Sequence, residues 1–337
     1  MTPLLEVTDV KTYFHINKDK VVKAVDGVSF EVREGEVVAL VGESGSGKSM
    51  TSLSIMGLVD DAGEVNGSIR LDGEELTDLS ERQLSKVRGQ KMAMIFQEPM
   101  TSLNPVYTIG NQIMETLRKH KKMSKKEAEV RAIELLQLVG FGRAEENLKS
   151  YPHELSGGMR QRVMIAIAMS CDPKLLIADE PTTALDVTIQ QQILDLMLRV
   201  RDEIQSSILL ITHDLGVVAE TAERVLVMYG GQIVEESPVY DLFTKPLHPY
   251  TQGLLSSMPK IEEDKERLEA ISGMVPAAHN FPGGCRFAPR CQLATERCRH
   301  EAPELVQVSS TRAVRCFLYK EASLKADLSL LEPGVGV

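Results

Sequence analysis

A glycine-rich stretch at residues 36–58, EVVALVGESGSGKSMTSLSIMGL, constrains the fold of this chain more than any other. Its apolar run at 37–41 predicts a buried strand, and the residues from Lys48 onward predict a helix. Between them lies G-x-x-x-x-G-K-S, the pattern of a phosphate-binding loop in the strand–loop–helix setting that its mechanism requires. A glycine-rich turn that matches by chance is the alternative, and the flanking elements disfavour it. We therefore expect the chain to bind a nucleoside triphosphate.

The residues of this loop have distinct expected roles. The glycines let consecutive backbone N–H groups turn inward around an anion, and the following helix adds its positive dipole end. Lys48 is expected to reach the outer phosphates, and the Ser49 hydroxyl to bind the accompanying magnesium ion. The residues predicted to contact the nucleotide here are Gly42, Glu43, Ser44, Gly45, Ser46, Gly47, Lys48, Ser49 and Met50.

Polar side chains end three other predicted strands. Asp179 and Glu180 close the run at 174–181, His213 closes the run at 208–214, and Gln97 follows MAMIF at 92–96. Asp179 is expected to accept from magnesium-bound water, and Glu180 to act as the general base that polarises the attacking water. We expect His213 to hold the γ-phosphate and the water, and Gln97 to sense both the magnesium ion and the water. The alternative is a solvated strand end for the acids and a structural role for the histidine.

The remaining patterns indicate the fold class. Residues 4–33 alternate like two strands, and 224–236 predict a hairpin with a turn at 230–231. A helical pattern runs from about residue 113 to 140, with a capping box at 124–127, and the Pro- and Asn-rich residues 98–110 predict an exposed loop. Strands and helices alternate, which predicts an α/β core that is mainly parallel, with a small antiparallel sheet and a helical insertion.

Composition and charge narrow the class of protein. The chain has 337 residues, 43% hydrophobic and 26% charged, which suits one large domain and a smaller one. Its net charge of −10 disfavours nucleic acid as the main partner, and acids interleave with the lysines at 119–126 as on a solvated helix face. No run approaches the ~18 apolar residues that span a bilayer, and the N-terminus lacks the pattern of a signal peptide. We expect a cytosolic chain with reduced thiols.

Four of the five cysteines fall together near the C-terminus, with 5, 6 and 17 residues between them: Cys285, Cys291, Cys298 and Cys316. Four thiolates suit either zinc or an iron–sulfur cluster. Structural zinc sites usually show cysteine pairs about two to four residues apart, which this pattern lacks. A third possibility is that the four cysteines bind no metal and are buried as small core residues. Cys171 lies in an apolar helical pattern and is expected to be core.

The order of motifs over residues 4–236 resembles that of the ATP-binding subunits of ABC transporters. Residues 42–49 look like their Walker A motif, Gln97 like the Q-loop, and ADEP at 178–181 like the end of Walker B, with His213 as the switch histidine. ALD at 184–186 resembles the D-loop and contributes Asp186. LSGGM at 155–159 resembles the signature motif, which implies that four residues face the γ-phosphate held by a partner subunit: Ser156, Gly157, Gly158 and Met159. The resemblance implies ATP and Mg²⁺ as cofactors, with Ser49, Gln97 and Asp179 at the metal.

A narrower resemblance, to the oligopeptide and dipeptide importer ATPases, rests on YPHELSGGM, FQEPMTSLNP, HPYTQGLLSSMP and the tail GCRFAPRC. It favours a [4Fe–4S] cluster on the four tail cysteines, as a structural staple. It also implies an adenine-stacking aromatic residue at the end of the first strand, where the motif offset favours Phe14 over Tyr13. The implied partners are a second, non-identical ABC ATPase subunit, two transmembrane permease subunits and an extracytoplasmic peptide-binding protein.

We therefore expect an ABC-type nucleotide-binding domain at 1–260, with a helical subdomain at about 98–165, and a small Cys-rich extension at 261–337. The expected function is ATP hydrolysis that energises peptide import, from the cytoplasmic face of the cell membrane. The same role for nickel, glutathione or another small solute is the alternative within transport. A soluble ABC ATPase acting on nucleic acid or ribosomes is the alternative from another class; such proteins commonly carry two fused ATPase halves or long coiled-coil insertions, which this chain lacks.

Overall fold

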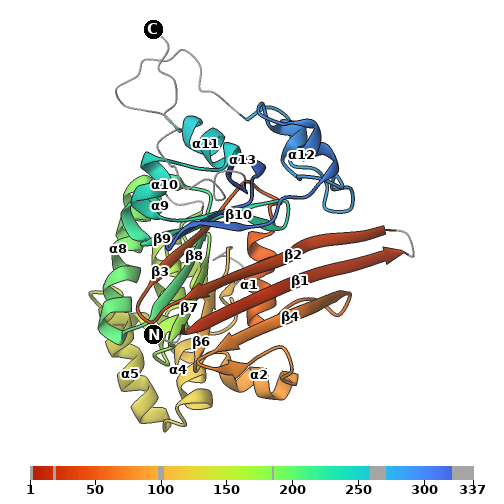
Figure 1. Ribbon diagram of the computed structural model, residues 1–337. Coiled ribbons are helices and arrows are strands. Elements are labelled where there is room, and N and C mark those ends of the chain that lie inside the picture. Colours follow the sequence, from red (N-terminus) through yellow and green to blue (C-terminus); the bar gives the residue numbers. More distant parts are fainter. Residues whose placement is uncertain (1–2, 18–19, 98–101, 184–185, 259–270, 321–337) are drawn as a thin grey trace.

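The computed structural model describes residues 3–17, 20–97, 102–183, 186–258 and 271–320 (Figure 1). Its larger sheet has eight strands, in the spatial order β11 (Val306–Ser309), β12 (Arg312–Val314), β10 (Gln232–Pro238), β9 (Arg224–Tyr229), β3 (Val37–Val41), β8 (Ser207–Thr212), β7 (Leu175–Asp179) and β6 (Met92–Ile95). The strands from β9 to β6 pair in parallel, and β10 returns antiparallel to β9. The predicted strands and the hairpin turn at 230–231 are confirmed.

The parallel strands are buried on both faces because their sequences are apolar runs rather than alternating patterns. Alternate residues of β3 enter different cores. Val37, Ala39 and Val41 pack in the core beneath the helices, whereas Val38 and Leu40 pack in a second core with the antiparallel sheet. The parallel sheet therefore has helices packed on one face and the antiparallel sheet on the other. The ends of its strands lie between these two layers.

The second sheet is antiparallel and has the order β2 (Lys20–Val32), β1 (Leu5–Asn17), β4 (Gly63–Leu71) and β5 (Glu74–Glu75). The helix α1 (Lys48–Met56) contributes Ile55 and Met56 to the core that this sheet shares with β3, β7 and β8. Figure 1 shows α1 between the two sheets. The expected antiparallel sheet beside the nucleotide loop is thus present.

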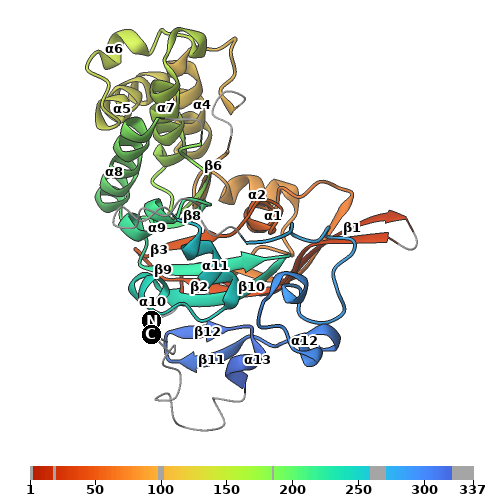
Figure 2. The same ribbon diagram turned by 90° about the horizontal axis from the view of Figure 1, so that it is seen from above.

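Five of the described helices form a block beyond the β6 edge of the parallel sheet (Figure 2). They are α4 (Ile109–His120), α5 (Lys125–Leu138), α6 (Ala144–Asn147), α7 (Gly157–Met169) and α8 (Val187–Ile204); α2 (Glu81–Val87) lies near α1. The capping box at Ser124 is confirmed. The predicted start of the first helix, at 113, is wrong: α4 begins at Ile109, because the Thr108 hydroxyl caps it by accepting from the Asn111 N–H at 3.3 Å.

The helices that follow β8 lie along the C-terminal part of the chain. They are α9 (Leu215–Thr221), which contacts the central strands β3 and β8, α10 (Val239–Thr244), α11 (Pro249–Ser256), the 3-10 helix η2 (Ala288–Arg290), α12 (Glu296–His300) and α13 (Phe317–Lys320). Strand β12 pairs antiparallel with β10, with Glu235 opposite Val314. The Cys-rich C-terminal segment therefore continues the larger sheet, and part of its backbone is held by that sheet.

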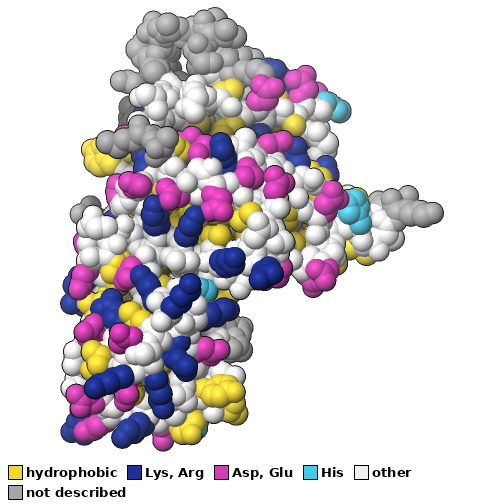
Figure 3. Space-filling model, turned by 90° about the horizontal axis from the view of Figure 1, so that it is seen from below, with side chains coloured by type: hydrophobic (Ala, Val, Ile, Leu, Met, Phe, Trp, Pro, Cys, Tyr) yellow, Lys and Arg dark blue, Asp and Glu magenta, His cyan; other side chains and the backbone are white. Residues whose placement is uncertain are grey.

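The surface mixes both signs of charge. Figure 3 shows Lys and Arg side chains interspersed with Asp and Glu over the face seen from below. On the helical block, Lys121 and Arg131 both pair with Asp172, at 3.0 and 3.5 Å. Across the described ranges, every helix is too short or too polar to cross a bilayer.

Candidate functional site

The phosphate loop joins β3 to α1 and packs against the neighbouring strands so closely that only glycine fits at two of its positions. A Cβ on Gly42 would lie 2.2 Å from the Met228 carbonyl oxygen, and one on Gly47 would lie 2.5 Å from the Ala24 carbonyl oxygen. Gly47 also has a φ of 107°, in the left-handed region that favours glycine. The loop is thus shaped by its contacts with β9 and β2 and ends at the N-terminus of a helix, where anions are favoured.

Lys48 lies inside the loop. Its Nζ donates to the carbonyl oxygens of Gly42 and Glu43, at 2.7 and 3.1 Å. Burial lowers the pKa of Lys48, while the charges of Glu180, Asp179 and Glu43 act in the opposite direction. Because little water screens charge at this site, the phosphates of a bound nucleotide would stabilise the protonated lysine strongly.

Ser49 and Asp179 meet beneath the loop. The Ser49 Oγ donates to the Asp179 Oδ1 at 3.2 Å. Burial raises the pKa of Asp179, and the hydrogen bond from Ser49 opposes that rise. A hydroxyl and a carboxylate at this distance supply the oxygen ligands that Mg²⁺ prefers, and a bound cation would favour the ionised carboxylate.

Glu180 is the centre of a hydrogen-bonded group that draws on several strand ends. Its Oε2 accepts from the Gln97 Nε2 at 3.0 Å and from the Thr183 Oγ1 at 2.9 Å, and its Oε1 lies 3.2 Å from the His213 Nδ1. Burial alone would raise the pKa of Glu180, but the hydrogen bonds with Thr183 and His213 and the charges of His213 and Lys48 hold it below its ordinary value. The carboxylate is therefore ionised at neutral pH, as a general base requires.

The backbone also contributes to this arrangement. Glu180 has a φ of 47°, in the left-handed region that a residue other than glycine rarely adopts, and its N–H donates to the Ile211 carbonyl oxygen of β8 at 2.8 Å. Strained backbone of this kind is concentrated at functional sites. The structure thus brings together Gln97, Glu180 and His213 as the sequence predicts. It adds Thr183, which the sequence analysis did not single out and which lies three residues after Glu180.

The signature residues lie apart from the phosphate loop. Ser156 caps α7 and accepts from the Met159 N–H at 3.3 Å, and Ser156 and Gly157 are exposed. Asp186 caps α8 by accepting from the Ile189 N–H at 3.0 Å; the neighbouring residues 184–185 of the predicted D-loop lie outside the described ranges. Figure 2 shows α7 inside the block of α4, α5 and α6, whereas α1 lies beside the sheets.

The two adjacent aromatic residues of β1 face opposite sides of their sheet. The Tyr13 hydroxyl donates to the Asp26 carboxylate, and burial together with this bond raises the pKa of Tyr13. Phe14 shares a strand face with Thr12, whose Oγ1 lies 2.6 Å from the Ser54 Oγ of α1. The face that carries Phe14 is therefore the one that meets α1.

The four tail cysteines line one cavity of about 170 Å³, together with His248 and Phe287: Cys285, Cys291, Cys298 and Cys316. A cavity of about 150 Å³ holds a molecule of the size of benzene, so this space suits a small group. Burial raises the pKa of Cys316 to about 11, and the other three sulfurs act in the same direction. As placed, the described residues include no group of three His, Cys, Asp or Glu that would bind a metal ion.

Two family models match this chain. The model described as ABC transporter matches residues 25–183, and the model described as oligopeptide/dipeptide transporter, C-terminal region, matches residues 234–298. The oligopeptide transport ATP-binding protein AppD of Bacillus subtilis is 62% identical over 323 residues, which cover 95% of this chain and 98% of that protein. The chain belongs to the oligopeptide/dipeptide group of ABC transporter ATP-binding subunits.

Other relatives of this ABC subunit agree in sequence and in fold. The dipeptide transport ATP-binding protein DppD of Haemophilus influenzae is 52% identical, over 93% of this chain and 94% of that protein. The structure of the ATP-binding cassette MJ0796, a dimer in a post-hydrolysis state bound to ADP and Pi, is 29% identical with a TM-score of 0.63, over 70% of this chain and 98% of that one. The predicted ABC-type α/β fold is confirmed.

Proposed function

We propose that this ABC subunit hydrolyses ATP to energise the import of oligopeptides or dipeptides across a cell membrane. The observation that carries the proposal is the group of Gln97, Thr183 and His213 around the ionised Glu180, beside a phosphate loop. The substrate class rests on the similarity to AppD and DppD, whose names refer to oligopeptide and dipeptide transport.

Each group has a role in the hydrolytic step. Lys48 and the loop amides hold the phosphates, and Ser49, Asp179 and Gln97 would hold Mg²⁺, which neutralises charge on the phosphate oxygens when bound. Glu180 accepts a proton from a water molecule while the oxygen of that water attacks the γ-phosphorus. The bond from the γ-phosphorus to the bridging oxygen breaks, which leaves ADP and phosphate. His213, next to Glu180, orients the water and the γ-phosphate.

The nucleotide site is completed by a second ABC subunit. The exposed Ser156 and Gly157 open a helix of 13 residues and offer backbone N–H groups to an anion, yet they lie on a different part of the chain from α1. In a head-to-tail pair, these residues, with Gly158 and Met159, face the γ-phosphate on the partner, and Asp186 lies at the same junction. The dimeric state of MJ0796 supports such a pair. We propose a non-identical second subunit.

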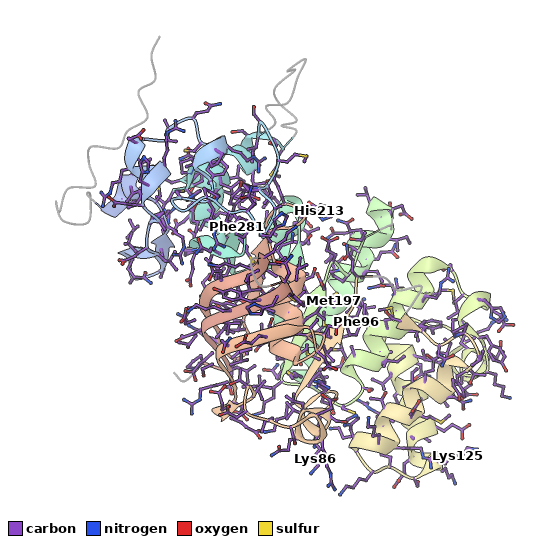
Figure 4. All side chains as sticks on the ribbon, turned by 90° about the vertical axis from the view of Figure 1, so that its right-hand side faces the viewer. Lys86, Phe96, Lys125, Met197, His213 and Phe281 are labelled. Atoms are coloured by element: carbon purple, nitrogen blue, oxygen red, sulfur yellow. The ribbon has the colours of Figure 1, made fainter. Side chains whose placement is uncertain are left out.

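The membrane subunits dock beside Gln97. Phe96 is 41% exposed, and Val106 and Tyr107, further along the chain, are 72% and 52% exposed. Figure 4 shows Phe96 between the sheets and the helical block. Exposed apolar side chains that form a patch mark interaction sites, and we propose that these three belong to one such patch. We assign this surface to docking against the transmembrane permease subunits, of which the transporter has two. Docking to them places the chain on the cytoplasmic face of the membrane. The permease subunits receive peptide from an extracytoplasmic binding protein.

Phe14 is the residue proposed to stack on adenine. It lies on the strand face that meets α1, whereas the Tyr13 hydroxyl is bonded to Asp26 and the Lys23 Nζ lies 5.5 Å from the Tyr13 ring centroid. Tyr13 is thus engaged on the other side of the sheet.

The four tail cysteines are proposed to hold a [4Fe–4S] cluster as a structural staple. Four thiols line one cavity and are the ligand type of such a cluster, and they would have to move closer together to bind it, because as placed they form no metal-binding group. Protein purified without oxygen is expected to contain about four irons per chain. Stoichiometric zinc without iron would instead establish zinc as the bound metal, and metal-free protein would support a core of unliganded thiols.

Co-purification from membranes tests the proposed function. The chain, tagged and solubilised in mild detergent, is expected to bring down two permease subunits and another ABC subunit, with ATPase activity stimulated by peptide-loaded binding protein. Stimulation of the ATPase by a nickel- or glutathione-loaded binding protein would support the transport role but would replace peptide as the proposed substrate. Recovery with ribosomes or nucleic acid alone would refute transport.

A further inference from the structure

A short segment of the C-terminal extension, residues 285–291, reaches back to the phosphate loop. Its Arg290 side chain is only 4% exposed and forms a two-pronged ion pair with Glu43 of the loop. The Arg290 Nη1 donates to Glu43 Oε2 at 2.6 Å, and the Nη2 donates to Oε1 at 3.0 Å. An arginine that makes two parallel hydrogen bonds to one carboxylate fixes the relative orientation of the two groups as well as stabilising the pair.

Glu43 connects this ion pair to the lysine of the loop. Its N–H donates to the Tyr250 hydroxyl at 2.8 Å, so both its amide and its carboxylate face the C-terminal part of the chain. Its carbonyl oxygen accepts from Lys48 Nζ at 3.1 Å and from the Ser46 N–H at 3.2 Å. A displacement of Glu43 would therefore be passed directly to the groups that line the phosphate site.

Arg290 is itself held from several sides. Its Nε donates to the Ser272 carbonyl oxygen at 2.9 Å, and its guanidinium carbon lies 5.8 Å from the Tyr229 ring centroid. Tyr229 packs edge-on against both Tyr250 and Phe287, with ring centroids 4.7 and 5.2 Å away. The guanidinium is thus held by contacts from several parts of the chain, so a shift of the C-terminal segment would move it relative to Glu43.

A second arginine of the same segment supports the loop from its other side. Arg286 donates to the Gly230 carbonyl oxygen and pairs with Asp26 of β2. The adjoining Gly231 N–H donates to the Ser46 carbonyl oxygen at 2.8 Å, so the turn that Arg286 holds is bonded to the phosphate loop. Phe281, which Figure 4 places where the extension meets the strands, packs beneath the Arg286 guanidinium at 4.2 Å from its ring centroid.

We propose that Arg290 is a positioning residue for the phosphate loop: through Glu43 it holds the loop and Lys48 in the geometry that receives the triphosphate of ATP. This rests on the proposed role of the loop in ATP binding. The C-terminal extension is then a part of the nucleotide site, built by the same chain that carries the Walker A motif, and not only an appendage to the ATPase domain.

The test measures binding of Mg²⁺ and a non-hydrolysable ATP analogue to the full-length chain by calorimetry, with thermal unfolding alongside. Arg290→Ala is expected to weaken binding about tenfold, because it leaves the Glu43 carboxylate without its bidentate partner. Glu43→Ala is expected to have a similar effect, and the double variant no more than the larger single effect, since both residues act through one contact. Arg290→Lys restores charge without the fork geometry and is expected to recover only part of the affinity.

Arg312→Ala is the matched control. Arg312 also joins the extension to the ATPase domain through a glutamate, Glu235 at 3.5 Å, but it does not touch the phosphate loop. It is expected to lower the unfolding temperature and leave nucleotide affinity unchanged. Equal losses of affinity in Arg290→Ala and Arg312→Ala, fully additive effects in the double variant, or unchanged affinity in Arg290→Ala would each overturn the proposal. Failure of the ATP-binding assignment is separate, because it would appear as unchanged binding in Lys48→Ala.

Discussion

Replacing Glu180 by glutamine changes one charge and little of the surrounding structure. Glutamine has the size of glutamate, and its carbonyl oxygen can accept from the Gln97 Nε2 and Thr183 Oγ1, which lie 3.0 and 2.9 Å from the present Oε2. Its amide nitrogen then faces the His213 Nδ1, at the 3.2 Å position of Oε1. The hydrogen-bonded group therefore persists when His213 carries its proton on Nε2, so that Nδ1 accepts from the new amide. The main change is then that the side chain can no longer accept a proton.

The expected magnitude follows from the role of the group. A positioned general base contributes a factor of about 100 to 10,000 in rate, which corresponds to about 2.7–5.4 kcal/mol of the activation barrier. ATP affinity is expected to be retained or to rise, because the removed negative charge lies near the phosphate site and acts electrostatically on Lys48 and Asp179. The turnover number therefore falls while the dissociation constant does not increase.

The assay compares steady-state ATP hydrolysis of the assembled transporter with nucleotide binding to the same preparation. Thr183→Val is the informative companion, since it removes one of the hydrogen bonds that lower the pKa of Glu180 but keeps the carboxylate. Its hydrolysis is expected to fall less than that of Glu180→Gln and to decline at a higher pH on acidification, as the carboxylate protonates more readily. Unchanged hydrolysis in Glu180→Gln would refute the assignment of Glu180 as base.

Two further variants probe binding and stability. Lys48→Ala is expected to weaken binding of Mg·ATP by at least about tenfold, the loss of one charged hydrogen bond to phosphate; an unaltered dissociation constant by calorimetry would contradict the phosphate role of this lysine. Arg224→Ala is expected to lower the free energy of unfolding by about 3–5 kcal/mol. The reason is that it leaves a buried carboxylate without its cation: Glu36 is 7% exposed and pairs with the Arg224 Nε at 2.9 Å. Urea unfolding measures this, with the more exposed Lys11→Ala as the control, expected to cost under about 1 kcal/mol; equal losses would refute the reasoning.

The sequence alone determined the elements that depend on local pattern. The apolar run before Gly42 and the glycines after it require a strand, a loop and a helix in succession, whatever packs around them. In the same way, Gln97, Glu180 and His213 each follow a strand of the sheet, and the carboxyl ends of parallel strands meet at one edge. Their proximity could be predicted because neighbouring parallel strands place their ends together without any knowledge of side-chain packing.

Tertiary structure alone decided the contacts between segments that are distant along the chain. The pairing of Arg290 with Glu43 spans 247 positions, and that of Arg286 with Asp26 spans 260, so no periodicity or spacing could indicate either. The same holds for the pairing of β12 with β10, which joins the extension to the sheet. Local sequence specifies which backbone is a phosphate loop, whereas the supports around that loop depend on where the chain returns after folding.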